Sequence, residues 1–107
     1  MFILGNVGAM GTQTTVEVRD NPDESRFEAY VDGQPAGYSA YLLSGTTITF
    51  LHTEVDDAFG GRGVGSSLVR QSLDQLRERE GLRVTASCPF VRSWIRKHPE
   101  YHDLGRR

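Results

Sequence analysis

The sequence predicts a mixed α/β domain of the α+β type, with four antiparallel strands followed by one strand–helix–strand crossover and a short C-terminal helix. Apolar and polar residues alternate over the first half of the chain, whereas apolar residues recur every three to five positions from Val64 onward. With 107 residues, 37% of them hydrophobic and 24% charged, the chain is long enough for one hydrophobic core but not for two. We therefore expect a single domain over residues 14–107, preceded by a flexible tail over residues 1–13.

The first half of the chain predicts an antiparallel meander with no helix. The expected strands are residues 14–19, 26–31, 34–43 and 46–55. Asp32-Gly33 is a strong signal for a tight hairpin between the second and third strands. Pro35 lacks a backbone N–H, so it predicts a sheet edge or a bulge at the start of the third strand.

The second half predicts a crossover that returns the chain to the same sheet. The apolar spacing predicts a helix from Val64 to about Arg79, which Gly81 ends. A short strand over residues 82–87 should then lie parallel to the fourth strand, because such crossovers are right-handed and place their two strands side by side. A second short helix should begin at Pro89 and end before His98-Pro99.

Composition narrows the functional classes. The single cysteine, Cys88, excludes an intrachain disulfide and a cysteine-rich metal site, so we expect no metal and a cytoplasmic location. Apolar runs are too short to span a bilayer, and basic residues alternate with acids, which argues against membrane and nucleic-acid partners. Residues 1–59 carry two basic and nine acidic side chains, a charge of −7, while residues 60–107 carry ten basic and five acidic side chains, a charge of +5.

The glycine-rich stretch from Phe59 to Ser66 predicts an anion site. Four of the six residues 60–65 are glycine, and they precede a helix, where backbone N–H groups bind phosphate. The stretch lacks the lysine of a P-loop. Ser66 stands where a dinucleotide fingerprint has its third glycine, and the next strand has no acid to bind a ribose. An ordinary flexible turn is the alternative to a diphosphate site.

The residues 60–65 resemble the pyrophosphate loop of the GNAT superfamily of acetyl-CoA-dependent acyltransferases, whose pattern is Gln/Arg-x-x-Gly-x-Gly/Ala. Gly63 and Gly65 match this pattern, whereas Gly60 stands where Gln or Arg is usual. Further stretches are similar to one compact branch, the YjdJ-type GNAT proteins, so that the resemblance runs from about Val16 to the end of the chain. These stretches are Arg26-Phe27-Glu28, His52-Thr53-Glu54-Val55, Cys88-Pro89-Phe90-Val91 and His98-Pro99-Glu100-Tyr101.

The resemblance implies a CoA or acetyl-CoA cofactor. Backbone amides from Arg62 to Ser66 would bind the diphosphate, and the strand around Thr53 to Val55 would pair with the pantetheine arm. The cofactor-binding residues expected on this basis are Thr53, Val55, Gly60, Gly61, Arg62, Gly63, Val64, Gly65 and Ser66.

Acetyl transfer also needs a proton acceptor for the amine and a proton for the leaving thiolate. His52 and Glu54 share one face of a strand, so Glu54 can orient the imidazole and raise its pKa, making His52 a base. Glu54 acting through a water, or a purely structural His52, are the alternatives. Cys88, expected near the thioester, is a candidate nucleophile, a proton carrier or an apolar wall. The resemblance also suggests that Tyr101 protonates the thiolate, although it lies beyond Pro99; alternatively it folds the C-terminus onto the core.

These residues together indicate an N-acetyltransferase-like protein that transfers acetyl to a primary amine. The acceptor is a protein lysine or N-terminus, a polyamine or another small amine. Compared with the superfamily, the chain has no helix between its first two strands and no hairpin after its last helix, so the substrate side is open or is completed by a protein partner or a second copy. The alternatives are a non-catalytic CoA-binding or interaction module and a nucleotide-binding protein.

Overall fold

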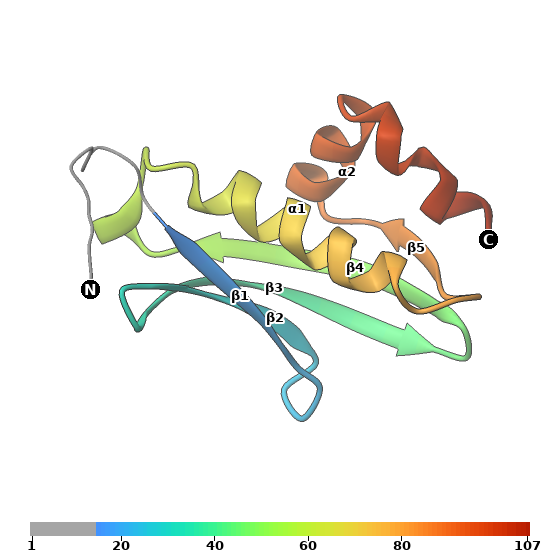
Figure 1. Ribbon diagram of the computed structural model, residues 1–107, viewed down its shortest axis with the longest axis horizontal. Helices are drawn as coiled ribbons and strands as arrows, with labels where there is room; N and C mark the ends of the chain where they lie inside the picture. The colour runs from blue at the N-terminus through green and yellow to red at the C-terminus, as the bar shows by residue number, and fades with distance from the viewer. Residues whose placement is uncertain (1–14) are drawn as a thin grey trace, which may run out of the picture.

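The computed structural model describes residues 15–107 and contains one five-stranded sheet with helices (Figure 1). The predicted tail, residues 1–13, lies outside the described residues. The strands are β1 (Val16–Asn21), β2 (Arg26–Val31), β3 (Gln34–Ser44), β4 (Thr47–Val55) and β5 (Arg83–Ala86). The helices are α1 (Val64–Arg77), α2 (Pro89–Arg96) and two 3-10 helices, η2 (Asp57–Phe59) and η3 (Pro99–Arg106).

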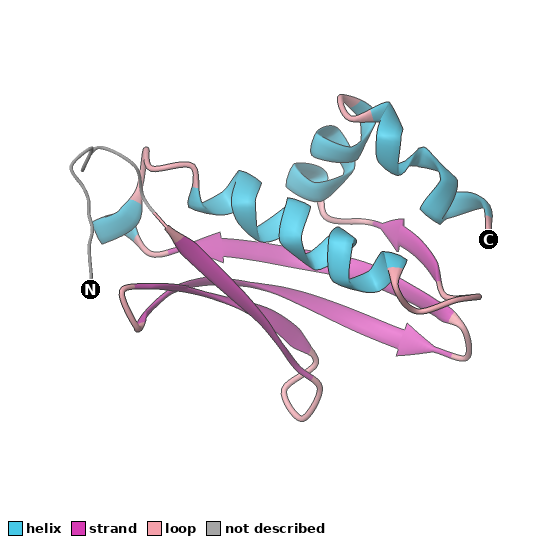
Figure 2. Cartoon of the chain, viewed as in Figure 1, coloured by secondary structure: helices cyan, strands magenta, loops and turns pink. Residues whose placement is uncertain are grey.

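The sheet order confirms the predicted topology. Strands β1 to β4 form an antiparallel meander, and β5 pairs with β4 in parallel after the α1 crossover. In Figure 2, α1, α2 and the C-terminal 3-10 helix are drawn on one side of the sheet. The buried stripe of α1 packs there against Phe27, Ile48 and Phe50 of the strands in one hydrophobic core. The other face of the sheet carries no helix within residues 15–107.

The predicted turns form as their residues dictate. Asp32 and Gly33 have φ values of 51° and 80°, the pair of positive angles that a two-residue hairpin requires. The β2–β3 register shifts between Ala29 and Tyr30, and Pro35 lies opposite Tyr30, which confirms the expected bulge at this proline.

Some predicted boundaries were wrong. The first strand was expected to end at Arg19 and turn at once, but β1 continues through Asp20 and Asn21, which pair with Phe27 and Arg26. The turn therefore falls on residues 22–25, where Ser25 takes a φ of 55°. Helix α1 ends at Arg77 rather than near Arg79.

A bulge in β4 was not predicted and determines which residues face the helices. Ala40 of β3 pairs with His52, whereas the next residue, Tyr41, pairs with Phe50, so Leu51 is the extra residue. Before the bulge Phe50 is buried in the core; after it, Thr53 is half-buried while His52 and Glu54 are exposed. Without the extra residue, His52 would have shared the face of Phe50.

Candidate functional site

The glycine-rich stretch forms one wall of a pocket of about 400 Å³ at the start of α1. The pocket is lined by Thr53, Val55, Phe59, Gly60, Gly61, Gly63, Val64, Gly65, Ser66 and Phe90. All the residues expected to bind a cofactor line it except Arg62, whose guanidinium lies over the Phe59 ring with its carbon 5.6 Å from the ring centre. The residues expected from the sequence to bind a cofactor therefore make up most of the lining of this one pocket.

Glycines are needed here because of the backbone conformation at the start of α1. Gly61 and Gly63 have φ values of 77° and 74°, and Gly63 is the N-cap residue, so no side chain caps the helix. The first hydrogen bond of the helix runs from Ser67 N–H to Gly63 C=O at 3.0 Å. The amides of Val64, Gly65 and Ser66 thus have no hydrogen-bond acceptor among the described residues. Free amides at the positive end of a helix dipole favour an anion.

Phe90 forms the opposite wall and was not predicted to belong to the site. A Cβ atom added to Gly65 would lie 2.9 Å from Cζ of Phe90, so any larger residue at this position requires the ring to move. Phe90 remains 45% exposed. The indole N–H of Trp94, one turn further along α2, donates to Ser66 Oγ at 2.8 Å and holds α2 against the loop.

Strands β4 and β5 separate next to this pocket. Their pairing ends at Phe50 and Ala86, and the N–H groups of Ser87 and Cys88 both donate to Phe50 C=O, at 2.9 and 3.0 Å. Residues 51–55 of β4 therefore have no partner strand on the β5 side among the described residues. This leaves an edge of β4 backbone leading from the glycine-rich loop toward Cys88.

Cys88 is buried behind this edge rather than at the mouth of the pocket. It is 3% exposed and does not line the pocket, but its thiol donates to Thr53 Oγ1 at 3.6 Å. Thr53 Oγ1 lies 2.7 Å from Oγ of the fully buried Ser39 on β3. Thr53 thus connects the pocket to two buried hydrogen-bonding groups.

His52 and Glu54 lie together on the opposite face of β4, as their spacing predicted. His52 Nε2 and Glu54 Oε2 are 2.8 Å apart, and the two side chains are 57% and 61% exposed. The edge of the His52 ring packs against Tyr38, with ring centres 6.2 Å apart. The structure therefore brings the candidate base and its carboxylate together but separates them from the glycine-rich pocket by the thickness of the sheet.

A second recess of about 290 Å³ lies on this open face beside Glu54. Its polar lining holds three carboxylates, Glu28, Glu54 and Asp56, against one cation, Arg26, with the rings of Tyr30 and Tyr38. Burial alone would raise the pKa of Glu28, but hydrogen bonds from Tyr30, Arg26 and Asn21 outweigh it and lower that pKa. The recess is therefore negatively charged at neutral pH.

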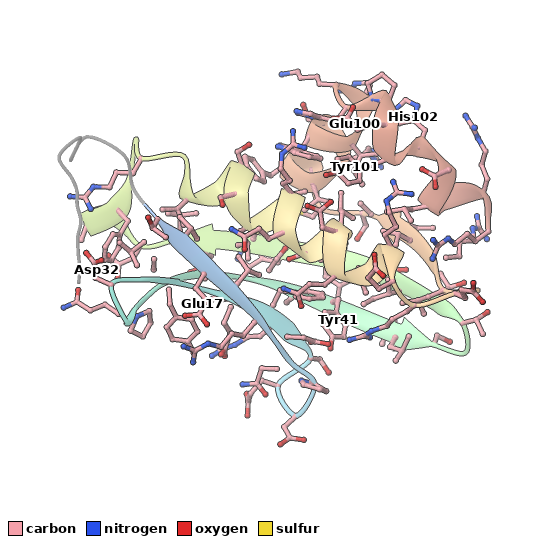
Figure 3. The ribbon with its side chains drawn as sticks, in the orientation of Figure 1. Glu17, Asp32, Tyr41, Glu100, Tyr101 and His102 are labelled. Carbon is pink, nitrogen blue, oxygen red and sulfur yellow. The ribbon has the colours of Figure 1, made fainter. Side chains whose placement is uncertain are left out.

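Tyr101 lies away from both recesses. Figure 3 shows Tyr101 on the C-terminal 3-10 helix. The glycine-rich loop lies at the N-terminal end of α1 (Figure 1), whereas Tyr101 contacts Arg70 and Asp74 further along that helix. Its hydroxyl donates to Asp74 Oδ1 at 2.6 Å and accepts from Arg70 at 3.1 Å, and the residue is 5% exposed. Burial and the Asp74 carboxylate raise the pKa of Tyr101. This arrangement fastens the C-terminal segment onto the core, which is the second of the two roles considered from the sequence.

Comparison with known proteins identifies the family. Residues 26–104 match the sequence profile of the family described as GCN5-related N-acetyl-transferase. The chain belongs to the GCN5-related N-acetyltransferase (GNAT) family. It is also 35% identical over 102 residues to Protein NATD1 of Homo sapiens, covering 94% of this chain and 89% of that protein. A shorter alignment to Protein NATD1 of Xenopus tropicalis is 34% identical over 60 residues and covers 56% of this chain and 54% of the frog protein.

Solved structures agree with this GNAT assignment. Ard1 from Thermoplasma volcanium is 29% identical with a TM-score of 0.52, covering 75% of this chain and 55% of that chain. A ribosomal-protein-alanine N-acetyltransferase from Brucella melitensis biovar Abortus 2308 shares the fold at 20% identity and a TM-score of 0.51, over 67% of this chain and 60% of that chain. Both alignments leave over a third of the other chain unmatched.

Within residues 15–107, no helix combines the length and apolar character needed to cross a membrane. Likewise, residues 15–107 contain no group of three or more His, Cys, Asp or Glu side chains arranged to hold a metal ion.

Proposed function

We propose that this GNAT protein binds acetyl-CoA in the glycine-rich pocket and transfers the acetyl group to a primary amine. The unpaired amides of Val64, Gly65 and Ser66 at a helix N-terminus carry this proposal. They offer several N–H donors to a diphosphate, and the glycine at position 65 lets the Phe90 ring pack close to the start of α1 as the opposite wall of the pocket. Arg62 adjoins these amides and supplies a positive charge.

The unpaired edge of β4 suits the pantetheine arm. Residues 51–55 offer backbone N–H and C=O groups beside the pocket, and Thr53 and Val55 also line it. An arm that extends from the loop along this edge brings its sulfur end toward Thr53 and Cys88. When bound, acetyl-CoA supplies a thioester, whose acetyl carbon is open to attack by an amine.

The acceptor amine approaches from the other face of β4. No helix covers that face within the described residues, and the acidic recess with two tyrosine rings favours a cationic ligand. The amine reaches the thioester in the gap where β4 and β5 separate beyond Phe50 and Ala86, and His52, oriented by Glu54 at 2.8 Å, accepts its proton through a bridging water. The buried position of Cys88 favours direct transfer over a covalent acetyl-cysteine.

A non-catalytic CoA-binding module is the second candidate function. It is favoured by the wide exposure of His52 and Glu54, which a small acceptor would leave in contact with water. On this account, CoA binds but no amine accelerates its release.

Release of free CoA from acetyl-CoA in the presence of an amine panel tests the proposed function. We expect acceptor-dependent release, reduced roughly 100-fold or more by His52→Ala with little change in the affinity for CoA. Glu17→Gln, which alters an exposed carboxylate on β1 paired with Arg19, is the control and should behave as wild type. CoA binding without any amine-dependent release would instead support the non-catalytic module.

A further inference from the structure

The hydrogen bonds around Thr53 fix the direction in which its hydroxyl proton points. A hydroxyl has one donor and accepts up to two hydrogen bonds. Thr53 Oγ1 accepts from the Cys88 thiol at 3.6 Å and lies 2.7 Å from Ser39 Oγ, a pair in which either oxygen can donate. The direction of this second bond decides whether Thr53 keeps a free donor.

The burial of Ser39 settles that direction. Ser39 is 0% exposed, and within residues 15–107 the hydrogen-bond partner of its hydroxyl is Thr53 Oγ1. If Thr53 donated to Ser39, the Ser39 proton would be buried without an acceptor, which costs free energy. If Ser39 donates, every buried donor in the group is satisfied. The Thr53 proton is then free to point into the pocket, which Thr53 lines.

We propose that the Thr53 hydroxyl donates a hydrogen bond to the sulfur of CoA and stabilises the thiolate as it leaves. This inference rests on the proposed function. In the reaction, the amine nitrogen forms a bond to the acetyl carbon, the carbon–sulfur bond breaks and its electron pair stays on sulfur. The amine proton goes to His52, the Thr53 proton stays on Thr53, and solvent finally protonates the thiolate.

The arrangement divides the reaction between the two faces of β4. The bulge at Leu51 turns His52 and Glu54 outward and Thr53 inward, so the proton acceptor and the thiolate donor lie on opposite sides of one strand. Ser39 and Cys88 act as positioning residues, because each donates a hydrogen bond to Thr53 Oγ1. The hydroxyl proton of Thr53 is therefore left for the ligand. Tyr101, which is bonded to Asp74, takes no part.

The ionisation of bound CoA tests this role without turnover. The probe is free CoA, and the pH dependence of its binding heat gives the pKa of its thiol in the complex. A donor at Thr53 should lower that pKa below its value in solution. Thr53→Ser should keep the lowered value, and Thr53→Val, which has the same shape without the hydroxyl, should lose it while affinity for the protonated thiol stays within a few-fold.

A matched control and a reversed arrangement complete the experiment. Thr49 and Thr85 form a similar hydroxyl pair at 2.7 Å outside the pocket, so Thr49→Val should leave the thiol pKa unchanged. If Thr53 instead donates to Ser39, Ser39→Ala will free its proton and lower the thiol pKa below the wild-type value. The inference is overturned by that result, or by a CoA thiol pKa in the Thr53→Val complex that equals the wild-type value. Both results leave the proposed function standing.

Turnover gives a second readout. Thr53→Val should slow acetyl transfer from acetyl-CoA by at least roughly tenfold, as loss of a donor to a developing anion does. The defect should shrink with an acetyl thioester of an acidic aryl thiol, whose thiolate needs less stabilisation. An equal defect with both donors contradicts the inference. Failure of wild type to bind CoA at all removes the proposed function together with this role.

Discussion

At the scale of single residues, Gly37 shows how closely β3 and β4 approach each other. A Cβ atom at this position would lie 2.5 Å from the backbone oxygen of Glu54 and 3.1 Å from Cα of Val55. Because backbone cannot move aside as a side chain does, Gly37→Ala must push apart the strands that hold His52, Glu54 and Thr53. The requirement for glycine here is steric and does not involve a positive φ.

We expect Gly37→Ala to lower the free energy of unfolding by about 1–3 kcal/mol, the usual cost of overpacking. Chemical denaturation measures it. The matched control is Gly60→Ala, where the added Cβ meets its nearest atom at 3.4 Å and φ is −61°. Equal stabilities of the two variants would show that the strands yield at Gly37 without cost.

The residue scale also shows what sequence reasoning can and cannot find. The glycines of the loop were identified because their spacing reports a backbone conformation directly. Phe90 was missed because its contact with Gly65 joins residues on different helices, and nothing local reveals that α2 places this ring over Gly65. The contact of Cys88 with Thr53 joins residues 35 positions apart, and only the tertiary fold brings them together.

At the scale of elements, the regular strands and helices and the bulge at Pro35 were predictable, but the bulge at Leu51 and the end of β1 were not. The hairpin at Asp32-Gly33 and the helix start at Val64 follow from local chemistry, and the structure confirms both. The bulge at Leu51 has no turn residue to mark it, because its register is set by pairing with β3. Pairing between strands also explains why β1 continues beyond Arg19. The pairing of Asp20 and Asn21 with β2 outweighs the tendency of these two residues to form a turn.

The C-terminal 3-10 helix gives a prediction at this scale. Tyr101 packs against Trp94 and donates to Asp74, so it joins η3 to α2 and α1. Tyr101→Phe should cost about 0.5–1.5 kcal/mol of stability, the net contribution of one hydrogen bond, because the exposed Asp74 carboxylate is hydrated when this donor is lost. The rate of acetyl transfer at saturating substrate should stay within about twofold of wild type.

Stopped-flow release of CoA and denaturant unfolding of the same Tyr101→Phe preparation separate the two effects. His98→Ala, which removes the ring stacked on Trp94 at 3.6 Å, is a comparison that also loosens this segment. A large loss of rate in Tyr101→Phe alone, with stability intact, would restore Tyr101 as the proton donor to the thiolate.

At the scale of the whole molecule, Asp20 connects the two oppositely charged halves of the chain. It accepts from Tyr41 of β3 at 2.7 Å and from Arg79, just beyond α1, at 2.6 Å. Burial raises the pKa of Tyr41 to about 12, and the hydrogen bond to Asp20 adds to the effect. The unfolded chain therefore loses this proton near pH 10 while the folded chain keeps it.

A raised pKa stabilises the fold below the unfolded value and ceases to do so as pH rises through the folded value. We expect the free energy of unfolding to fall between about pH 10 and pH 12, and to fall less steeply in Tyr41→Phe. Tyr30 and Tyr101 also have raised pKa values, so some slope should remain in the variant. Urea denaturation across this range measures the slopes, and identical slopes would contradict the assignment to Tyr41.

The fold class and the family follow from features spread along the whole chain, which is why both could be predicted. The acidic recess of the open face could not be predicted, because its lining comes from three strands and only the folded sheet assembles it. The proposed function requires that the glycine-rich pocket holds CoA.

Calorimetric titration of the purified protein with CoA and with acetyl-CoA tests that claim most directly. We predict that both ligands bind with one site per chain, and that Gly65→Val, folded as judged by thermal unfolding, loses most of the affinity because its side chain displaces the Phe90 ring, which forms the opposite wall of the pocket. No heat from either ligand with wild type at high protein concentration, or undiminished binding by Gly65→Val, would contradict it.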